Sequence, residues 1–513
     1  MRESGEQSEF PGAMTQGGSS RRTLLKLGLL TGAAVAVPVG RASASLQQWF
    51  LEQPVDSPPV PSFAVPFQRP PVLQPTSSTA TTDFYDITQS VVKVPIIPGL
   101  PPTTMWAYNS SVPGPTIVQR QGRDVRVRQH NALTGPGVST STHLHGGDVP
   151  PNSDGHPLDL VRPGATKEHF YPGLHAPALL WYHDHAIHET GRNVWMGLAG
   201  NYVVTSAAEE ALPLPKGAFD IPLTIQDRFF LKDGSIVYPR HDALRPLEQG
   251  VFGDVILVNG RPKPFLQVAR RKYRFRFLNG SNARVYRFKL STGEPFTAVQ
   301  TEGGFLPHPV TIPDFELAMS ERLSVVIDFA KYPIGTKIVL QNIMDDVPGD
   351  PFDRNKTREV MRFDVTSDAP DPSSVPADLL PRPDDVRPEQ SVVTRTFEFA
   401  RNGGQWTING KPFDEHRIDA KPKLGTVETW RFVNGGGGWW HPIHVHLIEF
   451  LPLSRTRRPL QPQERGLKDT ILIRSNEEAT VAMRWDHFRG LYVMHCHNVE
   501  HEDFDMMANI EVV

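Results

Sequence analysis

Residues 495–506 read HCHNVEHEDFDM and contain Cys496, the only cysteine of this 513-residue chain. Histidines flank the cysteine on both sides, and His501 and Met506 follow at intervals of five residues. A thiolate, two imidazoles and a weak axial thioether are the ligands typical of a blue-copper electron-transfer centre. Cys496, His501 and Met506 supply three of those four ligands, so this stretch predicts a copper-binding protein.

The histidines beside Cys496 indicate a second metal site close to the first. Successive side chains of a β-strand point to opposite faces, so His495 and His497 share the face that Cys496 does not occupy. Their Cα atoms lie about 6.6 Å apart at a strand rise of roughly 3.3 Å per residue, which suits two metal ions held side by side. One strand is therefore expected to join the thiolate centre to further metal.

Three other clusters bring the number of closely spaced histidines to ten of the 19 in the chain. These clusters are His143-Leu144-His145, His183-Asp184-His185 and His441-Pro442-Ile443-His444-Val445-His446. In each His-x-His pair both imidazoles share one strand face, whereas His441 has the opposite parity to His444 and His446 and is expected to join Cys496. A zinc site needs only three or four ligands, so ten imidazoles predict several ions. The nine remaining histidines are expected to have ordinary structural roles.

A repeat organises the chain around these clusters. Similar passages begin at Asn109, Asn259 and Asn409, and an alternating strand pattern follows each and ends at Asn131, Asn279 and Asn434. They predict one β-strand unit used three times, in a chain long enough for roughly three domains of about 150 residues. The predicted domains are 45–207, 208–368 and 390–513, with a proline-rich linker at 369–389. The middle domain contains only two histidines, so metal is expected between the first and third.

The N-terminus and the overall composition restrict location and partners. Arg21-Arg22, the apolar stretch 27–39 and Ala42-Ser43-Ala44 together resemble a twin-arginine signal, which predicts cleavage after Ala44, removal of residues 1–44 and export to the periplasm, the medium or the cell surface. No segment is apolar over the roughly 20 residues that a membrane-spanning helix needs. The net charge of −3 gives no indication of a nucleic-acid partner, and a single cysteine excludes an intramolecular disulfide.

The four histidine motifs, in this order, resemble the copper signatures of the multicopper oxidase (laccase) family. The resemblance extends from about Phe84 to the end of the chain, and the motifs look most like those of bacterial spore-coat laccases, with bilirubin oxidases and phenoxazinone synthases as near relatives. It implies an all-β fold of three cupredoxin-like Greek-key β-barrel or sandwich domains. It also implies four copper ions per chain, one of type 1, one of type 2 and two of type 3.

Position by position, the resemblance implies a ligand set for each copper. The type 1 ligands would be His441, Cys496, His501 and the axial Met506. The type 2 ligands would be His143 and His444. The type 3 ligands would be His145, His183, His185, His446, His495 and His497. Asp154 and Glu502 match the proton-relay positions of the family, although hydrogen bonding to a ligand histidine is an equally good interpretation of both.

The expected activity is that of an exported oxidase that couples four one-electron oxidations of phenolic or other aromatic donors to reduction of O2 to two waters. Bilirubin or metal ions are alternative donors, and a copper-free envelope scaffold is the alternative from another functional class. The filled ligand positions favour the enzyme. We expect donors to react at an exposed edge of His441, where Trp439 and Trp440 follow the glycines 435–438 and either stack on the donor or pack in the core. The physiological donor and the oligomeric state stay open.

Overall fold

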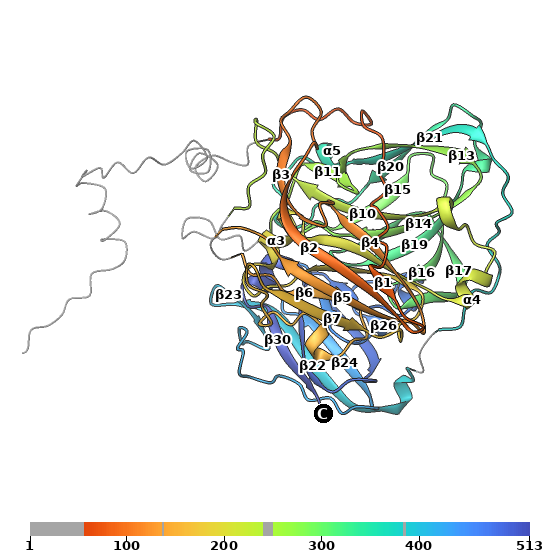
Figure 1. Ribbon diagram of the computed structural model, residues 1–513. Coiled ribbons are helices and arrows are strands. Elements are labelled where there is room, and N and C mark those ends of the chain that lie inside the picture. The colour runs from red at the N-terminus through yellow and green to blue at the C-terminus, as the bar shows by residue number, and fades with distance from the viewer. Residues whose placement is uncertain (1–55, 136–137, 240–249, 383–385) are drawn as a thin grey trace, which may run out of the picture. The chain divides into compact units, whose positions relative to one another are not determined.

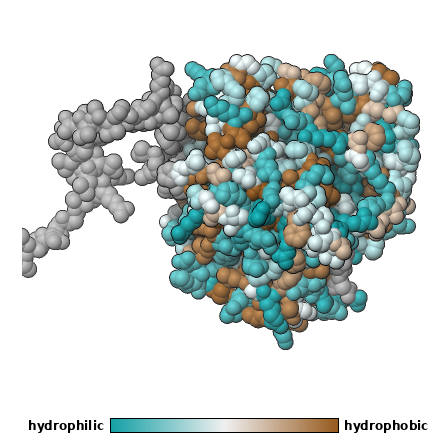
Figure 2. Space-filling model, in the orientation of Figure 1, coloured by the Kyte–Doolittle hydropathy of each residue, from teal (hydrophilic) through white to brown (hydrophobic). Residues whose placement is uncertain are grey.

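The computed structural model describes residues 56–513 apart from 136–137, 240–249 and 383–385. The predicted signal segment, residues 1–44, lies outside the described residues. Within them, strands dominate and assemble into six sheets (Figure 1), so the predicted all-β fold is confirmed. No helix in the described part of the chain is both long and apolar enough to cross a membrane. On the face seen in Figure 2, hydrophilic and hydrophobic residues are interspersed.

Two sheets form the first sandwich. One contains β1 (Ser77–Ser78), β2 (Thr82–Val94), β3 (Thr103–Tyr108), β5 (Asp124–Asn131) and β7 (Thr166–Tyr171). The other contains β4 (Gly114–Arg120), β6 (Thr142–His145), β8 (Ala178–Asp184) and β9 (Ala199–Thr205). Side chains of both sheets, among them Tyr85, Val127, Leu180 and Tyr202, share one buried core, because alternate residues of each strand point inward.

The middle sandwich is the largest. One sheet contains β10 (Asp220–Arg228), β11 (Val255–Val258), β12 (Arg261–Pro262), β14 (Lys272–Asn279), β16 (Phe296–Thr301), β17 (Gly304–Ile312) and β19 (Arg322–Asp328). The other contains β13 (Phe265–Arg270), β15 (Tyr286–Leu290), β18 (Phe315–Leu317), β20 (Lys337–Asn342) and β21 (Glu359–Asp368). Its core is rich in phenylalanine, including Phe275, Phe277, Phe288 and Phe363.

The third sandwich carries the cysteine. One sheet contains β22 (Ser391–Asn402), β23 (Gln405–Ile408), β24 (Val427–Asn434), β26 (Phe450–Arg455) and β28 (Glu478–Arg484). The other contains β25 (His441–Val445), β27 (Thr470–Ile473), β29 (Gly490–Cys496) and β30 (Met507–Val512). Cys496 and Met506 lie in its core with Trp430 and Trp485. The strand limits are compatible with the domain boundaries stated above, which stay predictions.

Helices in the described residues are short and lie between strands. They are α3 (Thr190–Met196), α4 (Ala207–Ala211), α5 (Arg354–Thr357) and α6 (Val499–Asp503), and the 3-10 helices η1 (Pro151–Ser153), η2 (Gly217–Phe219), η3 (Phe329–Lys331), η4 (Pro388–Gln390) and η5 (Pro462–Arg465). Of these, α6 matters most for the site because it carries His501. The side chain of Asn498 caps α6 by accepting a hydrogen bond from the His501 backbone N–H, which satisfies one of the amides left unpaired at a helix start.

The repeat seen in the sequence has a structural basis. Each sandwich contains an equivalent parallel strand pair, β2 with β5, β10 with β14, and β22 with β24. The leading asparagines Asn109, Asn259 and Asn409 adopt left-handed backbone φ angles of 47°, 49° and 52°, a conformation that asparagine tolerates better than most residues. In each case the side-chain oxygen accepts a hydrogen bond from a backbone N–H of the first strand of the parallel pair. The same turn therefore starts each unit.

The closing asparagines also have equivalent contacts, and the third one helps to build the site. The side-chain amide of Asn434 donates to the backbone carbonyls of Trp439, at 2.8 Å, and of Ile473, at 3.4 Å. Asn131 and Asn279 donate to two carbonyls in the same way. Asn434 thereby ties the glycine-rich loop to β27 just before His441 begins β25. The backbone of this loop is fixed close to the predicted thiolate centre.

Candidate metal centres

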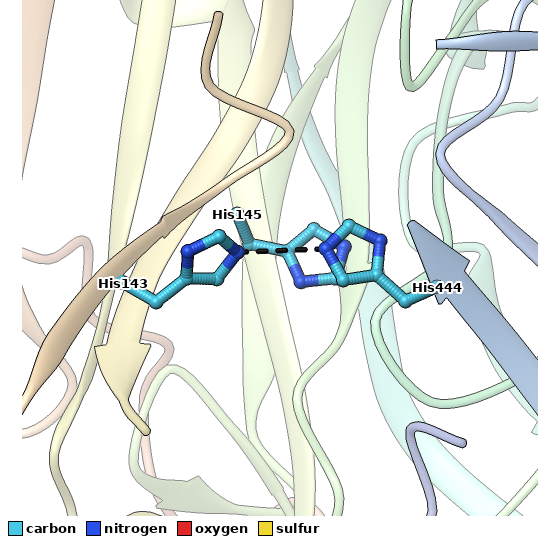
Figure 3. A group of neighbouring side chains, drawn as sticks. All are labelled: His143, His145 and His444. Carbon is cyan, nitrogen blue, oxygen red and sulfur yellow. Dashed lines mark hydrogen bonds between the residues drawn. The ribbon is translucent and has the colours of Figure 1, made fainter. Parts of the chain in front are cut away.

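Two antiparallel strand pairs present the clustered histidines. In the first sandwich, β6 and β8 pair with His143 opposite His183. In the third, β25 and β29 pair with His444 opposite His495 and with Ile443 opposite Cys496. The antiparallel register thus sets histidine against histidine within each sandwich. Figure 3 shows His143 and His145 from the first sandwich meeting His444 from the third.

Eight imidazoles converge where the first and third sandwiches meet, and each of them is at most 1% exposed. Their ligand atoms form three groups in which all atoms lie within 4.8 Å of one another. The groups are His145 with His183 and His497, His185 with His446 and His495, and His143 with His145 and His444. In the last group, Nε2 of His143 and Nε2 of His444 are 3.4 Å apart. The structure thus brings together every histidine for which a type 2 or type 3 role was expected.

The group of His185, His446 and His495 has the chemistry of a metal site. Nε2 of His495 lies 3.1 Å from Nε2 of His185 and 3.3 Å from Nε2 of His446. Each Nδ1 lies instead against a carboxylate. Nδ1 of His446 is 2.7 Å from Asp154 Oδ2, and Nδ1 of His185 and of His495 are 3.2 Å and 3.1 Å from the carboxylate of Glu502. If each Nδ1 carries the proton, three Nε2 lone pairs face one another. A cation between them would satisfy all three.

The group of His145, His183 and His497 supports the same conclusion. Nδ1–H of His183 donates to the Asp184 carbonyl at 2.8 Å, which leaves its buried Nε2 without a protein partner. Nδ1 of His145 and both ring nitrogens of His497 also lack a protein partner. Buried polar atoms are rarely unpaired in native proteins. Burial lowers the pKa of His497 to about 3, so these nitrogens are available as neutral ligands.

The second centre is built around the cysteine. Cys496 Sγ lies 3.4 Å from His441 Nδ1 and 3.5 Å from His501 Nδ1, and the three ligand atoms fall within 4.8 Å of one another. Met506 is fully buried in the same core, and its backbone carbonyl accepts a hydrogen bond from the Cys496 N–H. Burial raises the pKa of the Cys496 thiol well above its usual range. A thiolate here therefore requires a metal cation beside it.

The expectation that His441 has an exposed edge is wrong. His441 and His501 are both fully buried, because Trp406 on β23 stacks on the His501 ring with centroids 3.9 Å apart. Trp439 is half-buried and meets Trp406 edge to face at 5.7 Å, whereas Trp440 lies under the guanidinium of Arg474. Trp406 comes from a strand well before the histidine motif, so no local sequence signal marked it as the cover of this centre.

Both predicted relay carboxylates reach the histidine cluster. Asp154 is fully buried, and in addition to its carboxylate contact with His446 its backbone carbonyl lies 2.5 Å from Nδ1 of His143. Glu502 bridges His185 and His495 and accepts a hydrogen bond from Thr190 Oγ1 at 2.7 Å. Burial alone would raise the pKa of Glu502, but its histidine neighbours, above all His185, outweigh burial and hold the pKa well below the usual range. Thr190 carried no signal in the sequence.

Comparison with known proteins agrees with this geometry. Residues 92–209 and 385–513 each match a family model described as multicopper oxidase. A bilirubin oxidase from Albifimbria verrucaria is 37% identical over 501 residues, which cover 93% of this chain and 86% of the relative. A laccase from Bacillus stratosphericus is 34% identical over 522 residues, which cover 90% of this chain and 99% of the relative.

The fold has solved counterparts as well. The crystal structure of a laccase from Pediococcus acidilactici matches with a TM-score of 0.80 at 30% identity, over 90% of this chain and 96% of that one. Sequence and structural similarity therefore both extend over most of the chain. On this evidence the chain is a laccase-like oxidase with cupredoxin-like domains and belongs to the multicopper oxidase family.

Proposed function

We propose that this oxidase takes single electrons from phenolic or other aromatic donors at the Cys496 centre and uses four of them to reduce one O2 to two waters at the histidine cluster. His441, Cys496, His501 and Met506 would hold one copper. His143 and His444 would hold a second. The two groups His145, His183, His497 and His185, His446, His495 would hold one each. Bound copper would supply the one-electron redox chemistry at the first centre and the reduction of O2 at the cluster.

One observation carries this proposal, namely the end of β29. Cys496 points into the core of the third sandwich toward His441 and His501, whereas its neighbours His495 and His497 enter the histidine cluster. The thiolate is therefore joined to the cluster by a single peptide unit on either side. This arrangement supports fast electron transfer between a donor-facing centre and an oxygen-reducing centre.

The chain's own residues would handle water and protons. The eight cluster imidazoles are almost completely buried, which excludes bulk water from the cluster. Reduction of O2 to water consumes four protons, and Glu502 is the first candidate to pass them on, because it accepts a hydrogen bond from Thr190 Oγ1 at 2.7 Å and contacts His185 and His495. Asp154 Oδ2, at 2.7 Å from Nδ1 of His446, is the second candidate for a proton-transfer group.

Donor binding is assigned to the face of Trp439. Its ring is half-buried and meets the His501 ring edge to face with centroids 6.1 Å apart, so a single ring would separate an aromatic donor on Trp439 from this buried ligand. Bilirubin is an alternative donor because a bilirubin oxidase is among the relatives. We expect Trp439→Ala to raise the KM for phenols and to leave the copper content unchanged. An unchanged KM would exclude Trp439 from donor binding.

The test of the proposed reaction is its stoichiometry. We expect purified, copper-loaded protein to consume one O2 for every four equivalents of a one-electron phenolic donor and to release no hydrogen peroxide. Cys496→Ser is the matched control, and it should lose donor oxidation because the thiolate centre is gone. Accumulation of peroxide at two equivalents per O2, or equal activity in the Cys496→Ser variant, would contradict the proposal.

Export is a further part of the proposal. The residues that support it are Arg21, Arg22 and the small-residue site that ends at Ala44, which together have the order of a twin-arginine signal. We expect the exported protein to begin at Ser45, and the Arg21→Lys, Arg22→Lys double variant to remain uncleaved inside the cell. N-terminal sequencing of both forms tests this. Cleavage of the double variant at the same site would argue against the twin-arginine route.

A further inference from the structure

The middle sandwich supplies none of the predicted copper ligands, yet one of its arginines reaches the histidine cluster. Arg322, the first residue of β19, is 1% exposed. Its guanidinium donates two hydrogen bonds to the fully buried carboxylate of Asp469, at 2.8 Å to Oδ1 and 2.6 Å to Oδ2. Such a bidentate pair fixes the plane of the carboxylate as well as its position.

Asp469 is in contact with imidazoles from both neighbouring sandwiches. Its Oδ1 lies 3.0 Å from Nε2 of His145, and its backbone carbonyl lies 2.8 Å from Nδ1 of His444. An Nε2–H on His145 that donates to Asp469 leaves the ring's Nδ1 as the ligand atom, and that nitrogen has no protein partner. Asp469 thus selects the tautomer and orientation of two cluster histidines, in the way that carboxylates behind metal-bound histidines do.

The arginine itself is held from all three sandwiches. Its Nε donates to the Leu179 carbonyl on β8 of the first sandwich at 2.9 Å, and its Nη1 donates to the Ser320 carbonyl of its own sandwich at 3.2 Å. Gly146, which ends the His-x-His-Gly motif, leaves room for the pair. A Cβ at this position would lie 2.5 Å from Asp469 Oδ2 and 2.6 Å from Arg322 Nη2.

We propose that Arg322 is a positioning residue of the oxygen-reducing cluster, and that it acts through Asp469 to fix His145 and His444 from the sandwich that carries no ligand. This inference rests on the proposed function, because it assigns a role toward the copper that the cluster would hold. Lysine cannot replace arginine here, since an ammonium lacks the planar fork that meets both carboxylate oxygens. The buried Lys468 is occupied elsewhere, because it is paired with Glu302.

The experiment compares Arg322→Lys with Arg274→Lys. Arg274 is also a buried arginine of the middle sandwich, 2% exposed, and it pairs across to Glu209 of α4 at 2.7 Å without being near a predicted ligand. Copper-loaded proteins are titrated with a chelator, and the copper remaining per chain is measured together with the visible absorption of the Cys496 centre. For Arg322→Lys we expect cluster copper to be lost at an about 10–100-fold lower chelator concentration, with the Cys496 absorption retained. Arg274→Lys should match the unmodified protein in both measurements.

A second variant controls for the possibility that the substitution simply destabilises the folded protein. In the double variant Arg322→Met, Asp469→Asn neither charge is left unpaired, so folding should be less affected than by either single charge removal, but the orientation of His145 is lost. It should therefore also release cluster copper early and keep the Cys496 absorption. Equal chelator sensitivity of Arg322→Lys and unmodified protein, or an equal loss in Arg274→Lys, would overturn the inference. Failure of the unmodified protein to bind copper would instead reject the proposed function itself.

Discussion

At the scale of single residues, the chemistry depends on what each buried side chain faces. Cys496 is surrounded by apolar core residues and two imidazoles, so its thiol stays protonated until a cation arrives. One position away on either side, His495 contacts Glu502 and His497 lies among the imidazoles of the histidine cluster. Strand alternation alone produces this separation, which is why the sequence sufficed to divide the histidines between two centres.

Glu502→Gln tests the most consequential single side chain beside the cluster. Loss of the carboxylate removes the group that accepts from Thr190 and contacts His185 and His495. We expect O2 reduction to slow by about 10²-fold or more, the range typical of a lost proton-transfer group, and its pH profile to change while all copper is retained. The measurement is oxygen uptake across pH at saturating donor. An unchanged rate and profile would reject the relay, and loss of copper would leave Glu502 only an orienting role.

At the scale of elements, the three repeated β-units were predictable because the same residue type recurs at the same turn. Asn109, Asn259 and Asn409 each combine a left-handed backbone with a hydrogen bond from a preceding strand, and the need for asparagine at each turn is visible as a sequence pattern. The cover of the Cys496 centre was not predictable, because Trp406 lies on a different strand from the histidines it protects. Arg322 and Asp469 were missed for the same reason, since they are 147 positions apart in the chain.

Asn409 provides a test of the repeated turn. Its φ of 52° and its hydrogen bond from the Glu398 backbone N–H predict that Asn409→Ala lowers stability by about 1–3 kcal/mol, from left-handed strain and lost hydrogen bonds together. Asn409→Gly also loses the hydrogen bonds, but glycine adopts the left-handed backbone without strain. The stability of the glycine variant should therefore lie between those of the alanine variant and the unmodified protein. Thermal unfolding midpoints of the three proteins give the order. A glycine variant less stable than the alanine variant would contradict this account of the turn.

At the scale of the whole molecule, copper should determine how the protein responds to acid. Burial lowers the pKa of His185, His441 and His497 to about 3, whereas in the unfolded chain histidines titrate near 6.5. Between these values the unfolded state binds more protons, so the stability of the copper-free protein falls as the pH falls, by roughly 1.4 kcal/mol per histidine and pH unit.

Bound copper should add stability to the folded protein over the pH range in which it stays bound, because it binds the folded cluster and competes with protons there. We therefore expect the acid-unfolding midpoint, followed by tryptophan fluorescence, to lie at a lower pH for the copper-loaded protein than for the copper-free protein. The copper-loaded and copper-free forms are compared in zinc-free buffer, and a chelator is added to keep the second form free of copper. Identical midpoints in the two forms would mean that the buried imidazoles do not hold copper in the folded state.

Two buried centres in one chain are proposed to hold four coppers, and the copper-to-protein ratio is the measurement that decides this. After loading with excess copper and removal of loosely bound metal, we expect four coppers per folded chain, and three in Cys496→Ser with loss of the visible absorption of the thiolate centre. A ratio near zero in folded protein would exclude both copper centres and favour a copper-free scaffold.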